Sequence, residues 1–387
     1  MRVPNLFRGF HPPNSSACSA GRILLLAHVT LLCALASAQI AGAPTMEPFV
    51  GLGTNGFGQN TLDRDLRSPG QISKVRARAE KGSARDQFLM GYAYSKGLGE
   101  PQDYPQAFAW YRKAADHAEP AAITEVGRMY IHGVGTTQDY QEGMSWLRRA
   151  ASEGYAPAQT DVGLLYFQGL GVSPDYDGAV RWLQKAADQG YAPAESNLGV
   201  AYLEGTGVAR DLDRAAHWFR KAAGAGLETA QFNLASCYET GQGVPQDLAA
   251  AADWYLKAAQ QGHSGAQNNL ASMYQAGRGV PKDTVRALRL FLLAAEHGNM
   301  KAAVNLAKVF ELGIGVKADR SLAYMWLQVA ANGGEDVKEA LRALSSGITE
   351  RQVAVARQQA DQWWAKHHLE PAPATLASSD SRATSTP

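Results

Sequence analysis

The feature that most constrains this chain is a pattern that returns every 36 residues, seven times, without insertion. Each copy contains Gly-x-Gly, followed at a fixed distance by Asp. A period of roughly 20 to 50 residues is typical of solenoids, because one unit cannot bury its apolar face alone and stacks on its neighbours. The glycine pairs lie at 97/99, 133/135, 169/171, 205/207, 241/243, 277/279 and 313/315, and the acids are Asp103, Asp139, Asp175, Asp211, Asp247, Asp283 and Asp319.

A Gly-rich loop that leads into a helix is also a way to bind phosphate, because its backbone N–H groups face the anion. A nucleotide site is needed once, however, whereas this loop occurs seven times. No copy continues with the Lys-Ser/Thr of a phosphate-binding loop. We therefore predict that the loops are structural turns.

Each copy predicts two helices. In the first, an aliphatic residue is followed four positions later by an aromatic one, from Met90 and Tyr94 to Leu306 and Phe310, so both lie on one face, which we expect to be buried. Gly-x-Gly is expected to end this helix, and the Asp to cap the next one. The second helix carries Trp in six copies and Leu290 in the other, among small residues that allow close packing.

The pattern Leu-Gly-x-x-Tyr, Gly-x-Gly-Val-x-x-Asp, Ala-x-x-Trp-x-x-Lys-Ala-Ala-x-x-Gly resembles the Sel-one-like repeat (SLR) family, a tetratricopeptide-like solenoid, in its bacterial secreted or periplasmic type. The resemblance covers about residues 83–334. It implies an all-α fold, a right-handed superhelical solenoid of seven 36-residue helix-turn-helix repeats with helical caps. It also implies a role as an adaptor or scaffold for other proteins.

The first 38 residues predict a signal peptide. An apolar run follows Arg22 and ends in Ala36-Ser37-Ala38, with no acidic residue before it. We therefore expect export to the periplasm or the extracellular space after cleavage near Ala38. An uncleaved signal anchor is the alternative, and the only membrane attachment that we expect.

The rest of the chain divides by composition. Residues 39–70 and 370–387 are rich in Gly, Pro, Ser, Thr and Ala, so we expect a disordered linker and a disordered tail. The solenoid is expected at 71–334, as a half-repeat at 71–82 and seven repeats at 83–334. Capping helices are expected at 335–369.

Charge and motifs exclude several functions. Without the three arginines of residues 1–38 the chain has 34 basic and 36 acidic residues and no basic run. It therefore offers no positively charged surface that would attract nucleic acid or anionic lipid. The histidines have no metal-ligand spacing, and no nucleophile motif occurs. Cys237 is expected to be a buried structural thiol. We therefore predict a protein that is not an enzyme, with no catalytic residue, no metal and no cofactor.

What remains is a binding surface. Positions 36 residues apart form a column; a residue that serves the fold should recur in its column, and one that serves a site should break it. In tetratricopeptide-like superhelices the arc opposite the aliphatic/Tyr stripe lines a concave groove, which we expect to be apolar in copies two to four. An Asn column there suits peptide backbone. The predicted contacts for a protein or peptide partner are Arg128, Ile131, Leu164, Phe167, Val200, Leu203, Asn197, Asn233, Asn269 and Asn305.

Some alternatives stay open at this point. The Asn side chains would also recur if they bonded a neighbouring helix, and Phe167 and Leu203 would be apolar if they packed between repeats. The leading function is an exported, non-enzymatic scaffold. The alternatives are a cell-envelope enzyme or cell-wall/β-lactam ligand binder of the same repeat family, whose paired cysteines are absent here, and a plain spacer. An enzyme should show titratable groups that break the columns in the groove, and none is evident in the sequence.

Overall fold

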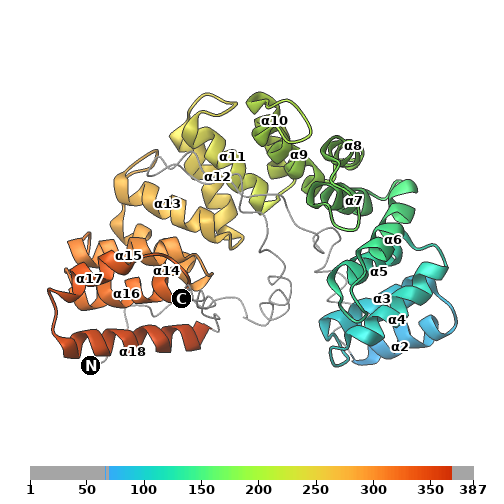
Figure 1. The fold of residues 1–387 in the computed structure, drawn as a ribbon, viewed down its shortest axis with the longest axis horizontal. Coiled ribbons are helices and arrows are strands. Elements are labelled where there is room, and N and C mark those ends of the chain that lie inside the picture. Colours follow the sequence, from blue (N-terminus) through green and yellow to red (C-terminus); the bar gives the residue numbers. More distant parts are fainter. Residues whose placement is uncertain (1–65, 67–68, 368–387) are drawn as a thin grey trace, which may run out of the picture. The chain divides into compact units, whose positions relative to one another are not determined.

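The computed structural model describes residues 66 and 69–367 (Figure 1). Within them the chain forms seventeen helices and no strand, so the all-α prediction is confirmed. The predicted signal peptide, most of the predicted linker and the predicted tail lie outside the described residues. The chain divides into two compact units, which we describe separately: residues 66, 69–194 and 206–208, and residues 195–205 and 209–367.

In the first unit, seven helices pack against one another in chain order. One helix of the predicted half-repeat comes first, and each copy then contributes two, which we call helix A and helix B. The helices are α2 (Pro69–Glu80), α3 (Ala84–Lys96), α4 (Tyr104–Asp116), α5 (Pro120–His132), α6 (Tyr140–Ser152), α7 (Ala156–Gln168) and α8 (Tyr176–Ala187).

The second unit continues the same alternation of helix A and helix B, and consecutive helices from α10 to α16 pack on one another. Its helices are α9 (Ala192–Glu204, whose first three residues belong to the first unit), α10 (Leu212–Gly224), α11 (Glu228–Thr240), α12 (Leu248–Gln260), α13 (Ser264–Ala276), α14 (Thr284–Glu296), α15 (Met300–Leu312), α16 (Arg320–Asn332), α17 (Lys338–Ser345) and α18 (Glu350–His367).

The Gly-x-Gly turn ends helix A as predicted. Gly169 has a left-handed φ of 66° and its N–H bonds the carbonyl of Leu165, and Asp175 then caps α8 by accepting the N–H of Gly178 at 2.8 Å. The second glycine has a further role. A Cβ on Gly171 would lie 2.6 Å from the carbonyl oxygen of Tyr140, so the turn lies directly on the start of the preceding helix B. It is a packing element of the solenoid.

The Tyr column of helix A differs from the prediction. The aliphatic members of the stripe are buried, but the tyrosines at 94, 130, 166, 202, 238 and 274 are only half-buried. Among the described residues, arginines donate to five of the six hydroxyls, those of all but Tyr238: Arg148 donates to Tyr166 at 2.5 Å and Arg286 to Tyr274 at 3.2 Å. The stripe was expected to be uniformly buried, and this is wrong because the phenol needs a polar partner.

A buried glutamine column, which was not predicted from the sequence, links successive repeats. Gln159 in α7 donates to the carbonyl of Ala151 in α6 and accepts from Gln189 after α8, at 3.2 and 2.8 Å. Gln231 and Gln267 repeat the arrangement, with Gln261 and His297 as their respective partners. One side chain thus satisfies a buried carbonyl of the repeat before it and ties down the end of its own helix B.

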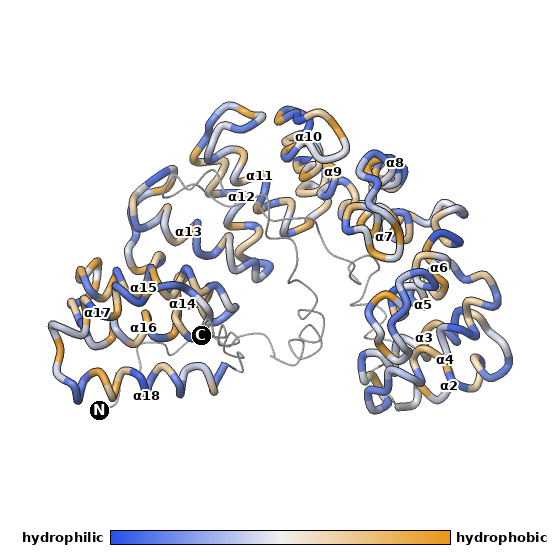
Figure 2. The backbone as a smooth tube through the Cα atoms, in the orientation of Figure 1, coloured by the Kyte–Doolittle hydropathy of each residue, from blue (hydrophilic) through white to orange (hydrophobic). Residues whose placement is uncertain are grey.

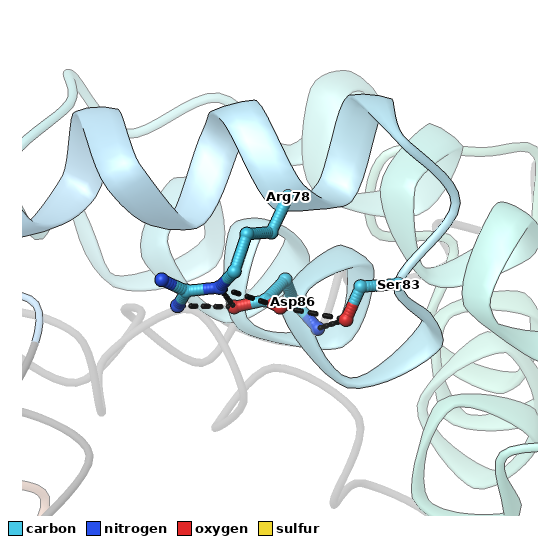
Figure 3. A network of polar contacts seen from close by, with 3 residues as sticks. All are labelled: Arg78, Ser83 and Asp86. Atoms are coloured by element: carbon cyan, nitrogen blue, oxygen red, sulfur yellow. Dashed lines mark hydrogen bonds and ion pairs between the residues drawn. The ribbon is translucent and has the colours of Figure 1, made fainter.

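Helix α2 covers the start of the solenoid. It begins at Pro69, two residues before the predicted half-repeat. Arg78 contacts both carboxylate oxygens of Asp86 in α3, at 2.6 to 3.0 Å, and Ser83 caps α3 and also donates to Asp86 (Figure 3). These contacts lower the pKa of the Asp86 carboxyl, and the hydrogen bond from Arg78 has the largest effect. Burial of the carboxyl opposes the shift.

Helices α17 and α18 cover the end. Thr349 and Gln352 form a capping box before α18. Hydrophobic and hydrophilic segments alternate along α18 (Figure 2), and it buries Ala356, Ala360 and Trp364 at intervals of four residues. The indole of Trp364 donates to the carbonyl of Val329 in α16. The cap therefore supplies the polar and apolar contacts that a next repeat would have made.

Candidate partner-binding face

Most of the predicted contact residues are buried. Leu164, Val200, Asn197 and Asn233 have at most 1% of their surface exposed, so they cannot touch a partner directly. The apolar groove expected in copies two to four is not formed by these side chains, because helix A is covered on several sides. The other buried members are Arg128, Ile131 and Phe167, and those that stay half-buried are Leu203, Asn269 and Asn305.

Phe167 illustrates why the prediction differed. Its ring keeps 8% exposure and lies against Tyr176, with ring centroids 6.1 Å apart. Tyr176 opens helix B of the same repeat. Phe167 is therefore buried, as the packing alternative expected, but the ring contact lies within one repeat and not between two.

A polar network in the second unit does reach the surface. The amide of Asn305 in α15 donates to Asn268 in α13 at 2.9 Å, and Asn268 donates to Asn269 at 3.3 Å. Asn269 donates to the hydroxyl of Tyr255 in α12 at 3.1 Å, and Tyr255 donates to Glu239 in α11 at 2.9 Å. We call these five residues the amide network. It crosses three copies and four helices, and every bond points the same way, toward Glu239.

The two ends of the amide network differ. Glu239 is 8% exposed, and Arg278 contacts its other carboxylate oxygen at 3.2 Å. Tyr255 is fully buried, and burial raises the pKa of its phenol, which therefore stays a hydrogen-bond donor. At the opposite end Asn268, Asn269 and Asn305 are half-buried, with Ser272 and Lys308 exposed on α13 and α15.

This arrangement offers hydrogen bonds to a ligand. An Asn side chain has two N–H donors and an acceptor oxygen. The network engages one N–H of each Asn and also the oxygens of Asn268 and Asn269, which leaves the second N–H of each side chain and the oxygen of Asn305. The remaining groups match the alternating N–H and C=O of a peptide backbone.

Tyr255 and Glu239 were missed in the sequence as members of a site. The signal was weak: the column is apolar at Ile131, Phe167 and Leu203 and becomes polar from Glu239 onward.

A charged cluster in the first unit also breaks its columns. Arg128 in α5 contacts Asp161 in α7 at 2.6 Å and Glu125 at 2.8 Å, and Asp161 and Glu125 occupy the column that holds Asn in copies four to seven. Burial raises the pKa of Asp161, with Arg128 opposing it; the two carboxylates keep the pKa of Arg128 above its usual value. The expectation that no such titratable cluster exists was wrong.

The described part of the chain also contains a thiol, that of Cys237. Cys237 is 1% exposed, and burial raises the pKa of its thiol to about 12, which leaves it unreactive. Residues 66 and 69–367 contain no group of three or more His, Cys, Asp or Glu side chains placed to hold a metal ion. None of the helices described is both long and apolar enough to cross a bilayer.

Comparison with known proteins agrees with the fold. The profile of the Sel1 repeat matches seven consecutive segments of the chain, which are residues 84–118, 120–155, 156–191, 192–227, 229–263, 264–299 and 301–335. A comparison with curated proteins gives no match.

Two solved structures are similar. One is a protective antigen present in uropathogenic Escherichia coli strains, described as displaying an SLR fold; it is 32% identical with a TM-score of 0.60, over 76% of this chain and 64% of the antigen. The chain thus spans just under two thirds of that antigen. The other is a Sel1 repeat protein from Oxalobacter formigenes, 32% identical with a TM-score of 0.56, over 63% of this chain and 96% of the other.

Proposed function

Because this chain belongs to the Sel1 repeat family, whose proteins generally serve as scaffolds for protein interactions, we propose that it is a non-catalytic scaffold that binds a protein or peptide partner. The observation that carries the proposal is the amide network. Its half-buried amides are held in fixed positions by bonds that end on a buried carboxylate, so a ligand meets donors and acceptors that are already ordered.

The proposed contact region is the part of the amide network on α13 and α15. Asn268, Asn269 and Asn305 supply the hydrogen bonds, and the exposed Ser272 and Lys308 extend the polar surface. An extended peptide segment fits this chemistry, since its backbone has a donor and an acceptor at each residue. Of the contacts predicted from sequence, Asn269 and Asn305 stay in the proposal as direct contacts, whereas the half-buried Leu203 on α9 is not part of this region.

We also propose that the scaffold is exported, with its signal peptide removed near Ala38. The support is the sequence of residues 1–38 alone: an apolar run after Arg22 and the Ala36-Ser37-Ala38 pattern. N-terminal sequencing of the protein recovered from the envelope and the medium tests it, because a start at or near Gln39 is expected.

The binding proposal is tested with a displayed library of random peptides, selected on the immobilised chain. The variant is Asn268→Ala/Asn305→Ala. The control is Asn332→Ala, a half-buried Asn at the end of α16 and outside the network. Selected peptides should bind the parent and the control equally and the double variant at least about tenfold more weakly, the effect of roughly one or two lost hydrogen bonds.

Two results would count against the binding proposal. Enrichment of no peptide on the folded parent would remove the support for a peptide-binding face. Equal binding of the selected peptides to parent and double variant would move the site away from the amide network.

The alternative is a cell-envelope enzyme or a cell-wall/β-lactam ligand binder, and one observation favours it. Arg128, Asp161 and Glu125 form a titratable cluster that breaks its columns, as a site would. All three charges are engaged with one another, which suits a structural role better. Turnover of a chromogenic β-lactam or of purified peptidoglycan by the parent, and its loss in Asp161→Asn, would support the alternative.

A further inference from the structure

Three residues that are rare in their columns meet at the start of α13. His263 stands where other copies have Ser83, Glu119, Tyr155, Tyr191, Leu227 and Asn299. Gly265 is the one glycine of its column, and Phe232 shares its column with one other Phe, at position 88. Residues that break their columns and contact one another are candidates for a dedicated function.

The three residues fit together closely. The imidazole of His263 stacks on the ring of Phe232, with centroids 4.5 Å apart and planes 19° apart. A Cβ on Gly265 would lie 3.1 Å from His263 and 3.2 Å from Phe232, so a side chain there would crowd the stack. The Nδ1 of His263 accepts the N–H of Ala266 at 3.1 Å and caps α13.

This cap is connected to the amide network through two routes. Phe232 contacts the ring of Tyr255, with centroids 5.6 Å apart, and the Tyr255 hydroxyl bonds both Glu239 and Asn269. Along the chain, the helix that His263 caps carries Asn268 and Asn269 on its second turn. A change at His263 therefore reaches the proposed binding amides by packing and by backbone.

We propose that His263 is a proton-sensitive latch: its neutral imidazole holds the first turn of α13 in place, and protonation releases this turn and with it the binding amides of Asn268 and Asn269. The proposal rests on the proposed function for its effect on a partner. The latch itself is a property of the fold and is testable without one.

The chemistry of the cap explains why acid opens the latch and base closes it. Nδ1 can accept the Ala266 N–H only while it keeps its lone pair, and the imidazolium carries a proton on both nitrogens. Burial lowers the pKa of His263 to about 4. Of the groups around it, Phe232 is uncharged, Tyr255 stays neutral, and the titratable ring of His297 lies beside Gly262 and bonds Gln267. Because the folded pKa is lowered, the latch is fully closed above the ordinary pKa of 6.5 and weakens as the pH falls toward 4.

The experiment measures amide hydrogen exchange of α13 by NMR between pH 7.5 and 4.5, with His263→Asn as the matched control. Asn299 caps α15 at the same position of its repeat, so an Asn can replace the His as a cap here. Unlike His, an Asn side chain has no proton to gain in this pH range. If the released turn restores the ordinary pKa of 6.5, the opening constant at Ala266 rises about tenfold between pH 7.5 and 5.5 in the parent. The Asn variant measured at the same pH values removes the intrinsic effect of pH on exchange.

The outcomes separate the latch from the binding proposal. A rise in the parent that is absent from His263→Asn supports the latch, and equal exchange in both overturns it. If the Asn variant fails to fold, His263→Ser decides the question, because Ser83 caps α3 in the same column. Binding of the selected peptides should weaken in the parent as the pH falls toward 4, where the imidazole is half protonated, and this loss should be absent from the Asn variant. If no peptide binds at any pH, the proposed function fails while the exchange data still decide the latch.

Discussion

The guanidinium of Arg128 contacts the carboxylate of Asp161 at 2.6 Å, although the two residues are 33 positions apart and both are more than nine-tenths buried. A buried charge is tolerated only with its partner, so removing one member leaves the other unpaired at a cost of roughly 3 to 5 kcal/mol. We expect Arg128→Leu to lower the free energy of unfolding by about this amount, measured by urea denaturation of each variant.

The chain itself supplies the control for this prediction. Leu164 and Asn197 occupy the columns of Arg128 and Asp161 one copy later, so Arg128→Leu/Asp161→Asn converts the pair to residues that this fold already accepts. The double variant should recover most of the loss. A double variant as unstable as the single one would show that the pair matters for shape and not for charge.

The two glycines Gly171 and Gly190 separate backbone conformation from packing. Both have positive φ, of 71° and 76°, but a Cβ on Gly171 would meet the backbone of Tyr140, while a Cβ on Gly190 meets nothing within 4 Å. We expect Gly190→Ala to cost about 1 kcal/mol in unfolding free energy, the strain of a left-handed Ala. Gly171→Ala should cost at least about 2 kcal/mol more. Similar losses in both variants would argue against the packing role of the second glycine.

The side chain of Gln159 should contribute more to the free energy of unfolding than that of Gln168, an exposed glutamine of the same helix. Replacing Gln159 by Ala removes two buried hydrogen bonds, each worth about 0.5 to 1.5 kcal/mol, so the cost is about 1 to 3 kcal/mol. The carbonyl of Ala151 keeps the N–H of Gly154, and the amide of Gln189 keeps the carbonyl of Lys185. Gln168 is exposed at the end of the same helix, and its replacement by Ala should change stability by less than about 0.5 kcal/mol. Thermal unfolding followed by circular dichroism compares the two variants, and equal melting temperatures would refute the role given to Gln159.

The contact between Arg78 and Asp86 should make the first cap sensitive to acid. The folded pKa of Asp86 is lowered, so its contribution to stability is present above the unfolded pKa of about 4 and is lost as the pH falls below it. Arg78→Met should therefore lower the melting temperature at pH 7 and have little effect at pH 2.5. The measurement is the difference between parent and variant at each pH, and a difference that persists in acid would exclude this pair as its source.

The fold was predictable because the same constraints recur seven times. A single Gly-x-Gly or a single Asp says little, whereas seven at one spacing define the turns, the caps and the number of helices. The capping residues Asp139 and Asp175 were identified correctly from short-range rules. These rules concern contacts within a few residues, where sequence spacing and distance in space agree.

The site was harder to predict for a physical reason. A helical wheel assigns one buried face, but helix A contacts neighbours on several sides, and every residue of α7 from Pro157 to Leu165 is buried. Exposure could therefore not be read from periodicity. The amide network also joins residues from four helices, and the partners of Asn269 and Asn305 depend on how the repeats pack. The one local sign was the change of this column from apolar to polar at Glu239.

The close approach of Gly171 to Tyr140 has a consequence for how proteins of this kind change length. Each turn rests on the helix of the preceding repeat, and each buried glutamine joins two repeats, so the insertion of a few residues would shift both contacts out of register. Loss or gain of a complete 36-residue block, in contrast, brings an equivalent glycine against an equivalent helix start. Such chains are therefore expected to lengthen and shorten by recombination of whole modules, and the amide network, which spans three of them, would be divided by any such event within it.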